Sequence, residues 1–90
     1  MKKVYTFKDI VFKPHKVIDG GVQGILKLPN GVTVSVVGGP RLYGDGIDTF
    51  EVGAWWEDSR KWIPLTEYDD VKHYVYKDEI DFLLYELMKK

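Results

Sequence analysis

With 90 residues, 44% of them hydrophobic and 14% aromatic, the chain has material for one packed core and room for one domain, over residues 1–90. The absence of cysteine excludes disulfides and thiolate metal sites. A net charge of −1 gives no general attraction to nucleic acid, and no apolar run is long enough to predict a membrane span. No apolar signal-peptide segment follows the first lysines, so we expect a cytoplasmic protein with no membrane partner.

Charge is unevenly distributed along the chain. Residues 1–44 hold seven Lys or Arg and two Asp or Glu, a balance of +5, whereas residues 45–70 hold two and eight, a balance of −6. Residues 71–90 hold four of each. If strands from the two halves alternate in a sheet, the signs mix. If they do not, the surface is dipolar and steers a charged partner.

The N-terminal third predicts a short strand and then a hairpin. Residues 7–9 indicate a turn, and the strand after them ends at Pro14, because proline cannot donate a ladder hydrogen bond. Residues 15–21 form a loop. The hairpin turns at residues 29–31, whose sequence is Pro-Asn-Gly.

Two registers are possible for this hairpin. A two-residue Asn-Gly turn pairs Leu26 with Ser35 and mixes apolar and polar side chains on each face. A three-residue loop pairs Leu26 with Val34 and suits a type I turn followed by a G1 bulge, so we expect this register. Its apolar face holds Val22, Leu26, Leu28, Val32, Val34 and Val36. Its opposite face holds Gln23, Lys27, Thr33 and Ser35.

Residues 38–46 form a loop with four glycines. The loop lacks the spacing of dinucleotide-binding and Walker motifs, and a strand rather than a helix follows it, which disfavours a nucleotide site. We expect a mobile loop that presents Arg41 and Tyr43, two residue types favoured at interfaces.

The next segment predicts a strand from Thr49 to Trp56, a turn at residues 57–60 and a partner strand at residues 61–65. In the expected register Ala54 faces Ile63 on the core side. Trp55 then meets Trp62 on the other face.

The last third predicts helix. Residues 66–70 offer a capping start for a short turn through Val75, and Asp78 is expected to cap a longer helix that ends near Met88. Ile80, Leu83, Leu84 and Leu87 have the spacing of a buried stripe. The simplest assembly is an α+β fold, an antiparallel meander of four or five strands with one main C-terminal helix, near residues 77–88, on one face. The expected core is Leu26, Val34, Val36, Phe50, Val52, Leu83, Leu84 and Leu87.

No catalytic constellation emerges from the sequence. Neither of the two histidines has a neighbour at metal-ligand spacing, and neither of the two serines stands in a nucleophile-elbow context. Asp69 and Asp70 could form a general acid and base pair, but adjacent carboxylates at a helix start are more typical of capping. We therefore expect no enzyme, no cofactor and no metal.

Trp55 and Trp62 are the most informative pair. They are either covered by the N-terminal segment, through Phe7 or Phe12, or exposed as an aromatic patch that anchors a partner or stacks on bases. The neighbouring Glu51 favours a protein partner over nucleic acid.

Several segments together resemble a group of small proteins encoded by tailed bacteriophages. They are Phe7-Lys8-Asp9-Ile10-x-Phe12-x-Pro14-His15, Pro29-Asn30-Gly31-x-x-Val34-Ser35-Val36-Val37, Tyr43-Gly44 and Asp69-Asp70-Val71-x-x-Tyr74. The similarity spans nearly the whole chain, but its motifs are turns and core positions, and Val32-Thr33 stands where an aromatic residue often follows Pro-Asn-Gly. The resemblance implies an anti-defence (anti-CRISPR-like) or host-takeover factor that binds and blocks a protein in the host bacterial cytoplasm.

The expected partner-binding surface joins Arg41, Tyr43, Trp55 and Trp62 with an acidic rim. The rim consists of Glu57, Asp58, Asp69 and Asp70. Acidic residues would attract a basic partner, such as a bacterial host or defence protein that handles nucleic acid. The alternative is a small nucleic-acid or nucleotide binder that uses the aromatic face and the glycine-rich loop; the acidic balance of residues 45–70 disfavours it.

Overall fold

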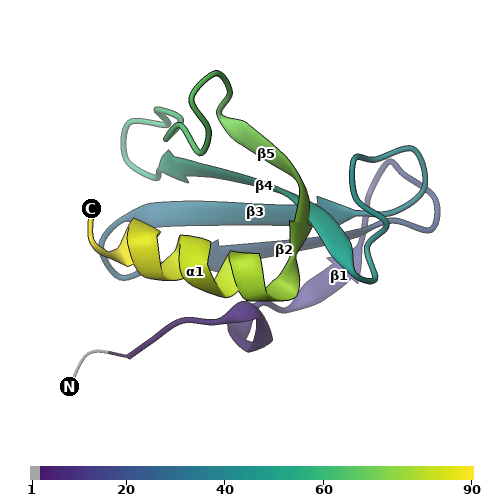
Figure 1. Cartoon of the computed structure of the whole chain (residues 1–90), viewed down its shortest axis with the longest axis horizontal. Helices are drawn as coiled ribbons and strands as arrows, with labels where there is room; N and C mark the ends of the chain where they lie inside the picture. Colours follow the sequence, from purple (N-terminus) through teal and green to yellow (C-terminus); the bar gives the residue numbers. More distant parts are fainter. Residues whose placement is uncertain (1–2) are drawn as a thin grey trace.

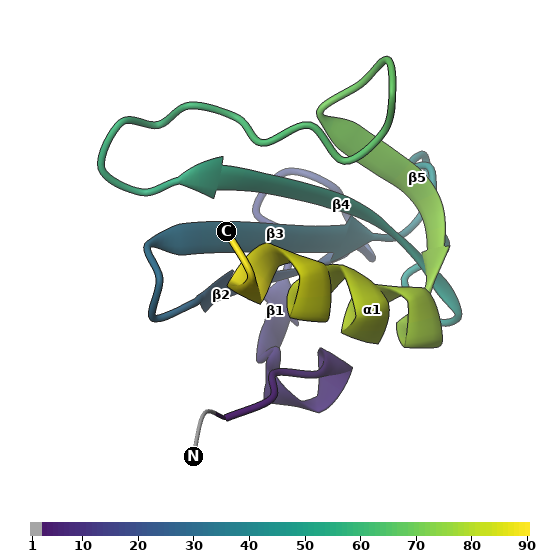
Figure 2. The ribbon, with the colours of Figure 1, turned by 60° about the vertical axis from the view of Figure 1, so that its left-hand side comes forward.

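The structure is a computed structural model that describes residues 3–90, and it has two layers (Figures 1 and 2). Five antiparallel strands form one sheet in the order β1-β2-β3-β4-β5, and a helix crosses one face. This confirms the predicted α+β meander. The elements are η1 (Phe7–Asp9), β1 (Phe12–Pro14), β2 (Val22–Lys27), β3 (Val32–Gly38), β4 (Thr49–Trp56), β5 (Val71–Tyr76) and α1 (Lys77–Met88).

The β2–β3 hairpin has the predicted three-residue loop. Leu26 pairs with Val34, and Leu28 N–H donates to Val32 O at 2.8 Å. Gly31 has a φ of 93°, a left-handed conformation that a side chain would strain. Local turn chemistry and hydrophobic alternation therefore agree, and the register is correctly predicted.

The partner of β4 differs from the prediction. Residues 61–65 were expected to form a strand and residues 66–75 a helical turn, but β5 (Val71–Tyr76) is the regular strand beside β4. Residues 61–63 add only a bridge, in the expected register: Trp55 pairs with Trp62, and Ile63 N–H donates to Ala54 O at 2.8 Å. Pro64 ends this short ladder because it has no N–H to donate. The rest of the β4 edge is then free to pair with β5.

Helix α1, Lys77–Met88, has the predicted bounds, but its N-cap lies two residues before the predicted one. Tyr76, not Asp78, is the N-cap, and its N–H donates to Glu79 Oε1 at 3.4 Å. Asp69 and Asp70 therefore do not cap a helix; Asp69 Oδ1 instead accepts the N–H of Val71 at the start of β5. Among residues 3–90, no helix is long and apolar enough to span a membrane.

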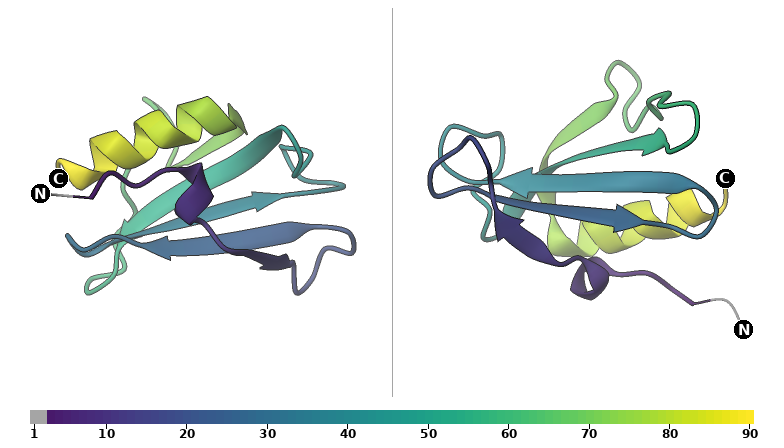
Figure 3. Two further views of the ribbon diagram at one scale, coloured as in Figure 1. Left: turned by 90° about the horizontal axis from the view of Figure 1, so that it is seen from below. Right: turned by 180° about the vertical axis from the view of Figure 1, so that it is seen from behind.

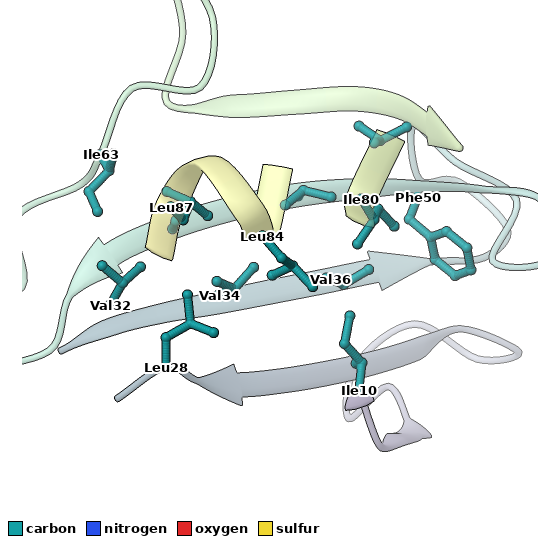
Figure 4. Packing of buried hydrophobic residues seen from close by; sticks show 13 residues of the cluster. Ile10, Leu28, Val32, Val34, Val36, Phe50, Ile63, Ile80, Leu84 and Leu87 are labelled. Carbon is teal, nitrogen blue, oxygen red and sulfur yellow. The ribbon is translucent and has the colours of Figure 1, made fainter. Parts of the chain in front are cut away.

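The core lies between the sheet and α1 (Figure 4). Six of the eight predicted residues are buried there, while Leu26 and Leu83 are partly buried and pack against the same cluster. The chain segment before β1 closes one side of it: the ring of Phe7 lies 5.4 Å from that of Phe12 and 5.3 Å from that of Phe50. Phe7 N–H also donates to Asp81 Oδ1 of α1, at 2.7 Å.

The order of the strands shows whether the basic and acidic segments of the sequence mix in the sheet. Because the strands follow one another in chain order, β1, β2 and β3 come from the basic half of the sequence, and β4 and the loop after it come from the acidic segment, whereas the loop before β4 spans the boundary between the two. The two halves do not alternate. The charge asymmetry of the sequence is therefore kept in space.

Candidate binding face

The face of the sheet opposite α1 is the candidate site, here called the open face. The right-hand view of Figure 3 looks onto it, with α1 behind the sheet. The strand registers set its side chains in three rows across the strands. The first row is Lys13, Gln23, Val37 and Glu51; the second is Ile25, Ser35, Gly53 and Val71; the third is Lys27, Thr33, Trp55 and Trp62.

Trp55 and Trp62 lie together on this face as predicted. Their ring centroids are 5.1 Å apart in an edge-to-face arrangement, and 51% of Trp62 is exposed. The Trp62 ring extends over Gly53, where an added Cβ would lie 2.8 Å from its Cζ3. Phe7 and Phe12 pack on the core side instead. The N-terminal segment therefore does not cover this pair.

Glu57 fixes the end of the sheet that carries the tryptophans. Its Oε2 accepts the hydroxyl hydrogen of the buried Thr33 at 2.7 Å, and its Oε1 lies 3.7 Å from Lys27 Nζ and 4.0 Å from Arg60 Nη2. The Thr33 hydrogen bond, followed by the two cations, holds the pKa of Glu57 below its ordinary value. The indole N–H of Trp55 adds a small effect of the same sign, although it is buried and has no partner in hydrogen-bonding geometry among residues 3–90.

Three of the four carboxylates of the expected acidic rim already have partners within the chain. Glu57 is paired with two cations, and Asp58 Oδ1 accepts the N–H of its neighbour Ser59. Asp69 and Asp70 directly precede Val71, which lines a hollow with Trp62, and Asp69 Oδ1 accepts the Val71 N–H. The charge beside the indoles is thus a compensated cluster, not a run of free carboxylates.

Tyr43 joins the open face, whereas the Arg41 side chain forms no hydrogen bond or ion pair within residues 3–90. The Tyr43 ring lies 4.6 Å from that of His73, whose Nε2 is 3.5 Å from Glu51 Oε1. Tyr43 N–H donates to Glu51 Oε2 at 3.0 Å, and Tyr43 O accepts the N–H of Tyr74 at 2.9 Å. Arg41 is exposed in the loop, with a φ of 69°.

The glycine-rich loop is held by more bonds than its composition suggests. Asp45 Oδ1 accepts the N–H groups of Ile47, Asp48 and Thr49 at 2.8–2.9 Å. These bonds, with that of Thr49 first, lower the pKa of Asp45 to about 2. A Cβ on Gly44 would lie 2.6 Å from Phe50 Cα, so the loop backbone packs directly on β4. The sequence predicts a mobile loop here, but these hydrogen bonds and this packing restrain its backbone.

Shallow hollows follow one another across the open face. One is lined by Gln23, Ser35, Trp55, Arg60 and Trp62, and a second continues from Ser35 and Trp62 to Val71. A third, at the β1 edge, is lined by Val11, Lys13, Pro14, Lys16, Gln23 and Ile25. Lys13 and Lys16 form no ion pair within residues 3–90.

The groups on the open face are suited to contact with another molecule. Over the part of the chain that the structure describes, no group of three or more His, Asp or Glu could hold a metal ion. His15 has a structural role, because its Nδ1 accepts the N–H groups of Val17 and Ile18 at 3.0 Å. Stacking, apolar contact and charge pairing are what the open face can supply.

The site residues predicted from the sequence do not include those on the β1–β2 side of the open face. Lys13, Lys16 and Ile25 were not predicted as site residues, although strand alternation indicates them. Ile25 lies between the core positions Gly24 and Leu26, and Lys13 lies between Phe12 and Pro14.

Comparison with known proteins identifies no relative of this chain. No family model, no curated protein and no solved structure matches the chain.

Proposed function

We propose that the chain is a non-enzymatic binding protein that docks its open face onto another protein and occludes it. The observation that carries the proposal is the exposed Trp62 indole, lying over Gly53 on a sheet face that α1 does not cover. A large aromatic ring with few rotatable bonds is the side chain that most often anchors an interface. The resemblance to small phage proteins makes a bacterial host or defence protein the proposed target, in the host cytoplasm.

The supporting cluster favours binding over a purely structural role for the tryptophans. Thr33, Glu57 and Arg60 fix the turn after β4, so the chain from Trp55 to Trp62 has one register. A preordered anchor loses little conformational entropy when a partner binds. The face therefore has both the apolar anchor and the rigidity that a docking surface needs.

The test is capture of partners from bacterial lysate, with mass spectrometry, for the wild type, Trp62→Ala and Phe82→Ala. Phe82 is a matched control because it is 63% exposed on α1, in the other layer. We expect a protein that is retained by wild type and Phe82→Ala, survives nuclease treatment and is lost with Trp62→Ala. Equal retention by all three proteins would contradict the proposal.

One observation supports a second candidate function, the binding of single-stranded nucleic acid. Lys13, Lys16 and Arg60 line the same run of hollows as the two indoles, and cations beside stacking rings are what such a site requires. Quenching of tryptophan fluorescence by a mixed-sequence oligonucleotide tests it. Binding that weakens steeply with added salt and is lost with Trp62→Ala would favour this candidate, and unchanged emission would exclude it.

A further inference from the structure

The open face has a central strand and two unlike halves. β3 is the third of five strands, so two strands lie on each side of it. On the β1–β2 side the face carries Lys13, Lys16 and the 44% exposed Ile25. On the β4–β5 side it carries Glu51 and the half-exposed Trp62, with Asp69 just before β5. One half is basic and aliphatic, and the other is aromatic, with one carboxylate, Glu51, in its first row.

Such a face is complementary to itself about one axis only. Consider a twofold axis that runs parallel to β3, in the plane between two copies. It places each row of one copy over the same row of the second copy, with the order of the strands reversed. β1 then lies over β5 of the second copy, and β2 over β4. A twofold axis across the strands would instead place basic edge on basic edge, which is unfavourable.

The registers show what the first axis brings together. Gly53 and Ile25 share the second row, at equal distances on either side of β3. The Trp62 ring that lies over Gly53 would therefore rest on Ile25 of the second copy. In the first row Gln23 would lie over Glu51 of the second copy, with Lys13 one strand further out.

The residues on the axis itself are compatible with this arrangement. Thr33, Ser35 and Val37 of β3 would each face the same residue of the second copy. None of the three carries a charge, so no like charges meet, and none is large enough to keep the sheets apart. We propose that two copies of this chain associate through their open faces, with β3 on β3 and Trp62 on Ile25.

The size of the face indicates a weak dimer. Five strands at roughly 4.8 Å and three rows of side chains about 7 Å apart cover on the order of 500 Å² per copy. The total of about 1,000 Å² lies at the lower limit for a specific interface. Self-association would thus mask the open face at high concentration and leave it free when the protein is dilute. This inference needs the same face as the proposed function but not its partner.

Single-cysteine variants test the axis, since the chain has no cysteine of its own. Ser35→Cys places the thiol on the axis, and Ser59→Cys, in the turn after β4, places it to one side. A bismaleimide with a spacer shorter than the about 10 Å between packed sheets should crosslink Ser35→Cys at least several-fold faster. Equal rates, or faster crosslinking of Ser59→Cys, would overturn the axis.

Sedimentation velocity from micromolar to millimolar concentration tests the contact. We expect a concentration-dependent dimer for wild type, loss of the dimer with Ile25→Glu or Trp62→Ala, and an unchanged dimer with Phe82→Glu, the matched exposed residue on α1. Lys13→Glu should weaken the dimer and remove part of its salt dependence. A monomer throughout, or a dimer that survives Ile25→Glu, would overturn the inference. Either result would leave the lysate capture to decide the proposed function.

Discussion

The covered and the open face of the sheet are made by alternate residues of the same strands, yet they are stabilised by different interactions. Toward α1, β3 and β4 present Val34, Val36 and Val52, which are at most 1% exposed and lie in the hydrophobic core cluster. On the other side, Thr33 and Trp55 depend on a hydroxyl–carboxylate hydrogen bond and a ring contact. Because the two sides share no side chains, one can be optimised for folding while the other is kept for binding.

The largest expected effect is on the covered face. Leu84 is 1% exposed, so Leu84→Ala removes buried methyl groups and leaves a cavity at a cost of about 2–5 kcal/mol. Trp62→Ala, on the open face, should cost less, about 1 kcal/mol, because its ring is half exposed but still contacts Trp55. Urea unfolding followed by circular dichroism measures both. Equal losses would show that the open face belongs to the core.

Substitution of two glycines by alanine compares the covered and the open face through the addition of a single methyl group. A Cβ on Gly24 would lie 2.3 Å from Cγ2 of the buried Ile10, so Gly24→Ala should overpack the core and cost about 1–3 kcal/mol. A Cβ on Gly53 would lie too close only to the Trp62 ring, which can turn into solvent, and at an ordinary 3.7 Å from Val71 Cγ2.

Gly53→Ala should therefore lie within about 0.5 kcal/mol of wild type, with tryptophan emission shifted to longer wavelength. Unfolding curves and emission spectra of both variants give the result. A larger loss for Gly53→Ala than for Gly24→Ala would reverse the assignment of the two faces.

Thr33→Val tests the polar network of the open face. The substitution keeps the shape of the buried side chain and removes the hydroxyl that donates to Glu57. Since this hydrogen bond is the main cause of the lowered pKa of Glu57, that pKa should rise toward its ordinary value of 4.5, which a carboxylate titration by NMR measures. An unchanged pKa would assign the shift to Lys27 and Arg60.

The smallest expected effect concerns the loop at residues 39–48 and depends on pH. The folded pKa of Asp45 is about 2, below its ordinary 3.8, so its bonds stabilise the fold fully above the ordinary value and are lost as pH falls through about 2. Asp45→Ala should lower the melting temperature at pH 7 and have little effect near pH 2. Hydrogen exchange at Ile47 and Thr49 should be faster in the variant at pH 7. A difference in melting temperature that persists at the lower pH would show another role for this residue.

Local signals predicted the parts of the fold that are close in sequence. The Pro-Asn-Gly turn and the alternation around it determined the β2–β3 register, and the spacing from Ile80 to Leu87 determined the buried stripe of α1. The pairing of Trp55 with Trp62 was also predicted, because only a tight turn separates them.

The prediction failed where pairing spans a longer stretch of chain. The sequence predicts a helical turn through residues 66–75, but residues 71–76 form β5 because β4 offers an unpaired edge beyond the bridge at Trp62. Tyr74 has a φ of 54° and interrupts the alternation of inward and outward side chains along β5. The sequence therefore does not show the period-2 pattern of a strand there.

The sequence by itself determined the α+β meander, the register of one hairpin, most of the core and the two tryptophans on one face. The tertiary structure decided which strand completes the sheet, that the basic and acidic segments stay on opposite sides of it, and that Glu57 faces Lys27 and Arg60 instead of an incoming partner. Turn geometry and alternation act between near neighbours and can be read locally. Charge pairing and edge pairing depend on which distant segments the fold brings together, and that is fixed only when the sheet closes on its core.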